Sequence, residues 1–174
     1  MILSPVFLKQ WKDTVARILH VPGNFTGKVL EMTMVVDKNL SAETVRDILP
    51  QLLKTLKMHD RTFQNVHFNL AYWEQDERME NNSCPMAMAM TEGFYQNYPK
   101  EQFSKDLGNL MTYLKLFHAR SKLIVLLTDG DYHISDMEVF NQSMQPFLEK
   151  KLLMVKCRQE EADCEITMHY RNFL

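Results

Sequence analysis

The chain has no long apolar run, no run of basic residues and few cysteines, and each absence narrows what it can be. The longest apolar stretches fall well short of the roughly 20 residues that cross a bilayer, which predicts no membrane span. The charge is nearly balanced, with 20 basic and 22 acidic residues, so the sequence gives no nucleic-acid-binding footprint.

The cysteines and the N-terminus bear on the compartment. Three cysteines, Cys84, Cys157 and Cys164, are a sparse and odd set that fits a reducing compartment better than a disulfide framework. Lys9 and Lys12 interrupt any apolar segment near the N-terminus, which therefore lacks a signal-peptide pattern. We expect a cytoplasmic protein.

Common catalytic signatures are missing as well. The sequence contains no Gly-x-Gly-x-x-Gly, P-loop, Gly-x-Ser-x-Gly or His-Glu-x-x-His motif. No combination of nucleophile and general base stands out either, which favours binding over catalysis.

Two expected strands, each followed by an aspartate, predict the fold. Residues 123–127 are all apolar and run into Thr128-Asp129-Gly130, and residues 29–36 run into Asp37. A continuous apolar run without alternation is typical of a strand buried on both faces, as in a parallel α/β sheet.

Helical and strand patterns alternate along the remaining chain. Helices are expected from Pro5, from Ser41 to about Met58, from Phe103 to Phe117, and after a Ser135/Glu138 capping box. Further strands are expected at 65–73, 151–157 and 165–170, whereas residues 74–97 give no clear pattern. The order predicts a three-layer α/β/α sandwich with a mostly parallel central sheet.

The length of 174 residues predicts a single domain. Its expected parts are an N-terminal helix and turn at 1–27, a core at 28–157 and a C-terminal strand or extension at 158–174.

Oxygen-bearing side chains follow both strands. Asp37, Asn39 and Ser41 stand at every second position after the first strand, and Asp129 follows the later one. Open α/β sheets bind ligands at the carboxyl ends of their strands, and Mg²⁺ prefers such oxygen ligands. Simpler roles stay open, because Ser41 also fits a helix N-cap, Asp129-Gly130 a turn, and Asp37 a helix start.

These motifs resemble the von Willebrand factor A-type domain, over roughly Lys28 to Cys157. That family carries Asp-x-Ser-x-Ser, a threonine at a later helix start, and Thr-Asp-Gly, which together build a metal-ion-dependent adhesion site. Here Asn39 replaces the first serine, and Thr128-Asp129-Gly130 matches the last motif. Ser104 is the best counterpart of the threonine, with Thr91 as the alternative. The metal ligands that the resemblance implies are Asp37, Asn39, Ser41, Ser104 and Asp129. They would bind Mg²⁺, or Mn²⁺ in its place.

The resemblance implies a non-enzymatic protein–protein interaction module, in which a partner's acidic side chain completes the shell of a strand-end Mg²⁺. One alternative is a Mg²⁺-dependent phosphohydrolase, although such an enzyme would want a second aspartate at position 39. Another is a structural A-type domain with an empty site. In the methionine-rich segment 79–90, Cys84, Met86, Met88 and Met90 suggest either Cu(I) ligands or adaptable apolar contacts. The partner, pathway and oligomeric state stay open.

Overall fold

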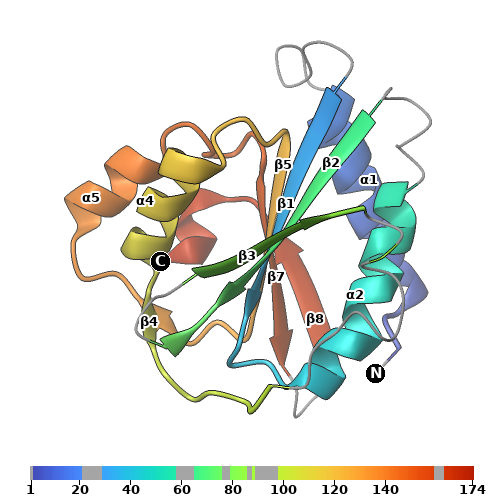
Figure 1. The fold of residues 1–174 in the computed structure, drawn as a ribbon, viewed down its shortest axis with the longest axis horizontal. Coiled ribbons are helices and arrows are strands. Elements are labelled where there is room, and N and C mark those ends of the chain that lie inside the picture. Colours follow the sequence, from blue (N-terminus) through green and yellow to red (C-terminus); the bar gives the residue numbers. More distant parts are fainter. Residues whose placement is uncertain are drawn as a thin grey trace.

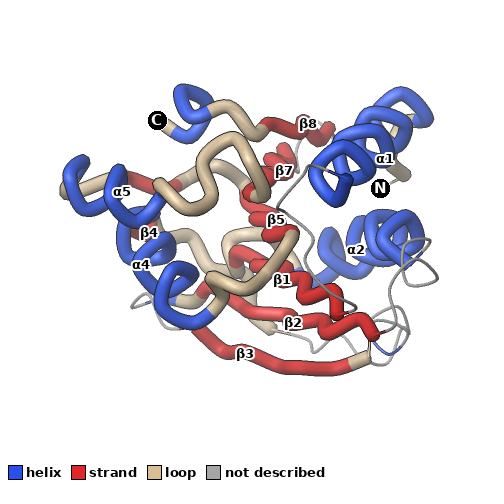
Figure 2. Tube along the Cα trace, turned by 90° about the horizontal axis from the view of Figure 1, so that it is seen from above, coloured by secondary structure: helices blue, strands red, loops and turns tan. Residues whose placement is uncertain are grey.

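A six-stranded sheet lies between two layers of helices in the computed structural model (Figures 1 and 2). The structure describes residues 2–20, 29–57, 65–75, 79–85, 88, 98–158 and 163–174. This arrangement is the predicted three-layer α/β/α sandwich.

The sheet has the order β3-β2-β1-β5-β7-β8. The four central strands are parallel: β1 (Val29–Asp37), β2 (Asn65–Trp73), β5 (Leu123–Thr128) and β7 (Leu152–Arg158). The two edge strands are antiparallel: β3 (Met79–Cys84) and β8 (Asp163–Thr167). A separate parallel pair joins β4 (Lys105–Asp106) to β6 (Tyr132–His133). The last strand thus ends earlier than predicted, and a 3₁₀ helix, η3, follows at Tyr170–Phe173.

Figure 2 shows the sheet edge-on, with helices on both sides. One face is covered by α1 (Pro5–His20) and α2 (Ala42–Lys57), and the other by α4 (Leu107–Phe117) and α5 (Met137–Met144). The predicted starts of α1 and α2 are confirmed, and α2 continues through Pro50.

The predicted starts of the other two helices are wrong. Helix α4 begins at Leu107, four residues after Phe103, because the Asp106 side chain caps it by accepting from Gly108 N at 2.8 Å. Helix α5 is capped by Asp136, whose Oδ1 accepts from two backbone amides. Ser135 is not the cap, because its hydroxyl donates to Asp106 Oδ2.

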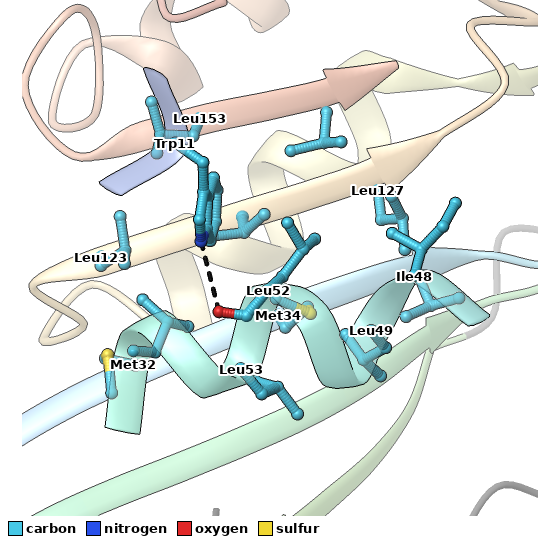
Figure 3. Close-up of a cluster of buried hydrophobic side chains, with 14 of the residues drawn as sticks. Trp11, Met32, Met34, Ile48, Leu49, Leu52, Leu53, Leu123, Leu127 and Leu153 are labelled. Carbon is cyan, nitrogen blue, oxygen red and sulfur yellow. Dashed lines mark hydrogen bonds between the residues drawn. The ribbon is translucent and has the colours of Figure 1, made fainter. Parts of the chain in front are cut away.

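The two sides of the sheet hold separate apolar clusters. Met32, Met34 and Val36 of β1 belong to the cluster under α1 and α2, and Val35 belongs to the cluster under α4 and α5. Trp11 is fully buried in the first cluster, and its indole N–H donates to the Leu52 carbonyl at 3.2 Å (Figure 3). Successive strand residues face opposite sides, so Asp37 lies on the α4 side with Val35.

Two of the three cysteines form a disulfide, which the sequence analysis did not predict. Cys157 and Cys164 are opposite each other on β7 and β8 and form a disulfide. This pairing corrects the expectation of a chain without disulfides. No helix in the described ranges is both long and apolar enough for a membrane crossing.

Candidate functional site

The predicted strand ends meet at one edge of the sheet. Strands β1 and β5 are parallel neighbours, with Val36 opposite Leu127, so Asp37 and Thr128 end their strands side by side. The Thr128 hydroxyl donates to Asp37 Oδ2 at 2.8 Å, and Asp37 is completely buried. We call Asp37, Asn39, Glu101, Lys105 and Thr128 the strand-end site.

A lysine that sequence reasoning missed lies at the centre of this site. Lys105 Nζ donates to Asp37 Oδ1 at 2.8 Å and to Asn39 Oδ1 at 3.0 Å. The same ammonium lies 3.4 Å from Glu101 Oε2, and its side chain is only 2% exposed. It also lies 5.7 Å from the centre of the Trp73 ring, close enough for a cation–π contact.

Asn39 ties the β1–α2 loop to the segment that carries Lys105. Its side-chain Nδ2 donates to the Phe103 carbonyl at 2.9 Å, and the Phe103 amide donates back to Asn39 Oδ1 at 3.2 Å. Its backbone amide donates to Asp37 Oδ1 at 2.9 Å. The carboxamide carries a donor and an acceptor on separate atoms, so it can bond both groups of one peptide segment. A serine hydroxyl is too short to make this reciprocal pair.

The other predicted ligands have contacts of their own. Ser41 caps α2, since its hydroxyl accepts from Thr44 N at 3.1 Å. The Ser104 hydroxyl is hydrogen-bonded to His133 Nδ1 at 2.9 Å on the surface. Asp129 Oδ1 accepts from Asp131 N at 2.9 Å within the turn after β5. The structure therefore brings Asp37 and Asn39 together around Lys105, and gives Ser41, Ser104 and Asp129 different local roles. Thr91 lies outside the described residues.

Burial dominates the electrostatics of Asp37. Loss of solvent raises the pKa of this carboxyl above its ordinary value, although Lys105, the Asn39 amide and the Thr128 hydroxyl each act to lower it. The ionised form depends on these three donors, because water does not reach it. The pair of Asp37 and Lys105 is thus closed to solvent, and its two charges offset each other.

A bound Mg²⁺ does not fit this arrangement. The ion needs about six oxygen ligands in near-octahedral geometry. Both carboxylate oxygens of Asp37 and the amide oxygen of Asn39 instead accept hydrogen bonds, and a positive ammonium lies against two of these three atoms. Within the described ranges, no group of three or more His, Cys, Asp or Glu side chains could hold a metal ion.

The proposed copper ligands are only partly described. Met88 is 52% exposed, while Met86 and Met90 lie outside the described residues, as does the side chain of Cys84. The copper prediction therefore stays a prediction.

The chain was compared with family models, curated proteins and solved structures, and none of them matches it. What the site does must therefore be argued from its geometry.

Proposed function

We propose that this chain is a protein-binding module of von Willebrand factor A type that performs no chemistry. The observation that carries the non-enzymatic part of this proposal is the closed state of Asp37 and Lys105 in the strand-end site. Asp37 is fully buried with both carboxylate oxygens hydrogen-bonded, and Lys105 is only 2% exposed. Neither group can reach a substrate. The carboxyl ends of the strands, where an α/β enzyme would hold its catalytic groups, instead connect the residues after β1 to the segment that carries Lys105.

The fold supports the A-type resemblance. The two strands that carry the matching motifs are adjacent and parallel, and Asp37 and Thr128 at their ends are hydrogen-bonded. Because the family resemblance supplies the binding role, that role is a proposal rather than a property of the fold.

The same contacts argue against the phosphohydrolase alternative. A phosphoryl-transfer nucleophile must approach the phosphorus in line, and Asp37 has no exposed oxygen with which to do so. Position 39 is an asparagine that bonds Lys105 and Phe103 rather than a second carboxylate. The remaining alternative is a structural domain without a partner. It differs from the proposal only in that its surface binds no other protein.

The surface beside the site suits an acidic partner group. Ser104 and His133 are exposed and hydrogen-bonded to each other; Ser104 directly precedes β4, and His133 belongs to β6. One of their two protons is used in that bond, and the other, on the hydroxyl or on the imidazole, can be donated to a carboxylate. We therefore propose this pair as the contact for a partner's acidic side chain.

Affinity purification from the native host tests this proposal. Tagged wild type should retain a partner that Ser104→Ala/His133→Ala loses, whereas Lys12→Ala, which changes an exposed residue of α1, should retain it. Equal retention by all three proteins would contradict the proposed contact. Hydrolysis of a phosphate ester by pure wild type, lost in Asp37→Ala, would contradict the non-enzymatic role.

A further inference from the structure

The ammonium of Lys105 is surrounded as a bound cation would be. A lysine has three N–H donors, and three side-chain oxygens lie near Nζ: Asp37 Oδ1 at 2.8 Å, Asn39 Oδ1 at 3.0 Å and Glu101 Oε2 at 3.4 Å. Two of these oxygens belong to residues that the sequence had assigned to a metal. We infer that Lys105 is a built-in cation that replaces Mg²⁺ in the strand-end site, so that the site is complete without a metal.

The charges explain why a cation is needed there. Asp37 is fully buried and the Glu101 side chain is 18% exposed, and without Lys105 both carboxylates would lose the ammonium that they share. An uncompensated buried charge is strongly unfavourable. The ammonium offsets one of these charges. It also repels a divalent ion at the same position, because two like charges a few ångströms apart interact strongly in a poorly solvated site.

The backbone explains how the lysine reaches this position. Lys105 belongs to β4, which pairs with β6 just after Thr128-Asp129-Gly130, and its side chain contacts Asp37 and Asn39 of the β1–α2 loop. Asn39 in turn bonds both backbone groups of Phe103, two residues before Lys105. The asparagine that departs from the family pattern therefore positions the segment that supplies the cation. Asn39 and Lys105 therefore act together.

The inference concerns the same site as the proposed function, but it does not depend on a partner. It is tested with pure protein by measuring melting temperatures in EDTA, in Mg²⁺ and in Mn²⁺. The proteins are wild type, Lys105→Ala, Lys105→Met and the control Lys38→Ala, which removes a nearby lysine that pairs with Glu74 at 2.6 Å.

We expect metal to leave the melting temperature of the wild type unchanged, and likewise that of Lys38→Ala. Both Lys105 variants should melt lower in EDTA, because Asp37 and Glu101 lose their counter-ion. They should then regain about 3 to 6 °C when Mn²⁺ is tenfold above its dissociation constant. A variant that folds only in Mn²⁺ would support the inference equally.

Three outcomes would overturn it. The first is a metal-dependent rise in the wild type that Asp37→Asn abolishes, because the native site would then hold the ion beside the lysine. The second is folded Lys105 variants that do not respond to either ion. The third is failure of both variants to fold in Mn²⁺ as well as in EDTA, because a divalent cation would then be unable to replace the ammonium. Partner binding plays no part in these measurements, so their failure is distinguishable from failure of the proposed function.

Discussion

The ammonium of Lys105 lies 2.8 Å from the carboxylate of Asp37, although 68 residues separate them in the sequence, and neither side chain is more than 2% exposed. Such a pair contributes little net stability compared with apolar packing, because both charges lose their hydration. Its value lies in specificity: each charge requires the other, so the β1–α2 loop and β4 have one compatible arrangement.

This mutual requirement predicts strong coupling between the two residues. Asp37→Leu or Lys105→Met alone should each destabilise the protein by about 3–5 kcal/mol, because one buried charge is left unpaired. The double variant should cost at least about 2 kcal/mol less than the sum of the two single variants. Urea unfolding of all four proteins measures this coupling free energy.

The pair of Lys38 and Glu74 supplies a control for that cycle. Its side chains are 16% and 17% exposed, so Glu74→Ala should cost only about 1 kcal/mol. Additivity of the Asp37 and Lys105 substitutions, or an effect no larger than that of Glu74→Ala, would show that the two residues do not form the proposed pair.

Thr128 should stabilise the site through its hydroxyl. It donates to Asp37 Oδ2 at 2.8 Å and accepts from Gly130 N at 3.0 Å. Thr128→Val should therefore lower the free energy of unfolding by about 1.5–3 kcal/mol, the range for hydrogen bonds to charged groups. Thr14→Val, which removes an exposed bond to the Gln10 carbonyl, should cost less than about 0.5 kcal/mol. Similar costs for the two variants in urea unfolding would contradict the role given to Thr128.

Gly130 is required by the turn that follows β5. Its φ is +87°, and a Cβ at this position would lie 2.3 Å from Cε of Lys156. Gly130→Ala should destabilise the protein by about 1–2 kcal/mol from backbone strain alone, with the crowding of Lys156 in addition. The double variant Gly130→Ala/Lys156→Ala should recover only the part due to crowding. Complete recovery, measured by thermal unfolding, would show that the backbone conformation is unimportant.

His118 should make stability depend on pH. Its side chain is 3% exposed, and burial lowers the pKa of this imidazole below its ordinary value, against the opposing effect of Glu31. Below about pH 6.5 the unfolded chain binds a proton that the folded chain does not, so stability should fall as the pH falls through that window. His118→Gln should show a smaller loss between pH 7.5 and 5.5 than the wild type.

His169→Gln is the matched control for His118, because the side chain of His169 is 72% exposed. It should leave the pH dependence of urea unfolding unchanged. A His118→Gln protein with the wild-type pH dependence would contradict the assignment.

The sequence predicted those features that depend on local pattern. The unbroken apolar run of residues 123–127 indicated a strand buried on both faces, and all of β5 is buried. This strand and the strand at 29–36, each ending at an acidic motif, were enough to predict that Asp37 and Thr128-Asp129 share one sheet edge, because the carboxyl ends of neighbouring parallel strands coincide.

The features that the sequence missed depend on distant partners. Lys105 stands in the polar segment Glu101–Asp106, where a lysine would normally be solvated, and its burial depends on Asp37 and Asn39 more than 60 residues away. The prediction that Ser135 caps a helix was wrong, because its hydroxyl donates to Asp106, which lies in β4. The Cys157–Cys164 pair follows from the register of β7 and β8, which no local pattern gives.

The most direct test of Lys105 as a built-in cation is anomalous X-ray scattering from crystals soaked in Mn²⁺, comparing wild type with Lys105→Ala. The account predicts a manganese peak in the variant alone, between the side-chain oxygens of Asp37 and Asn39 and about 2.0–2.6 Å from them. In the wild type the same position should hold the Lys105 ammonium. A manganese peak there in the wild type, with the lysine displaced, would contradict the account.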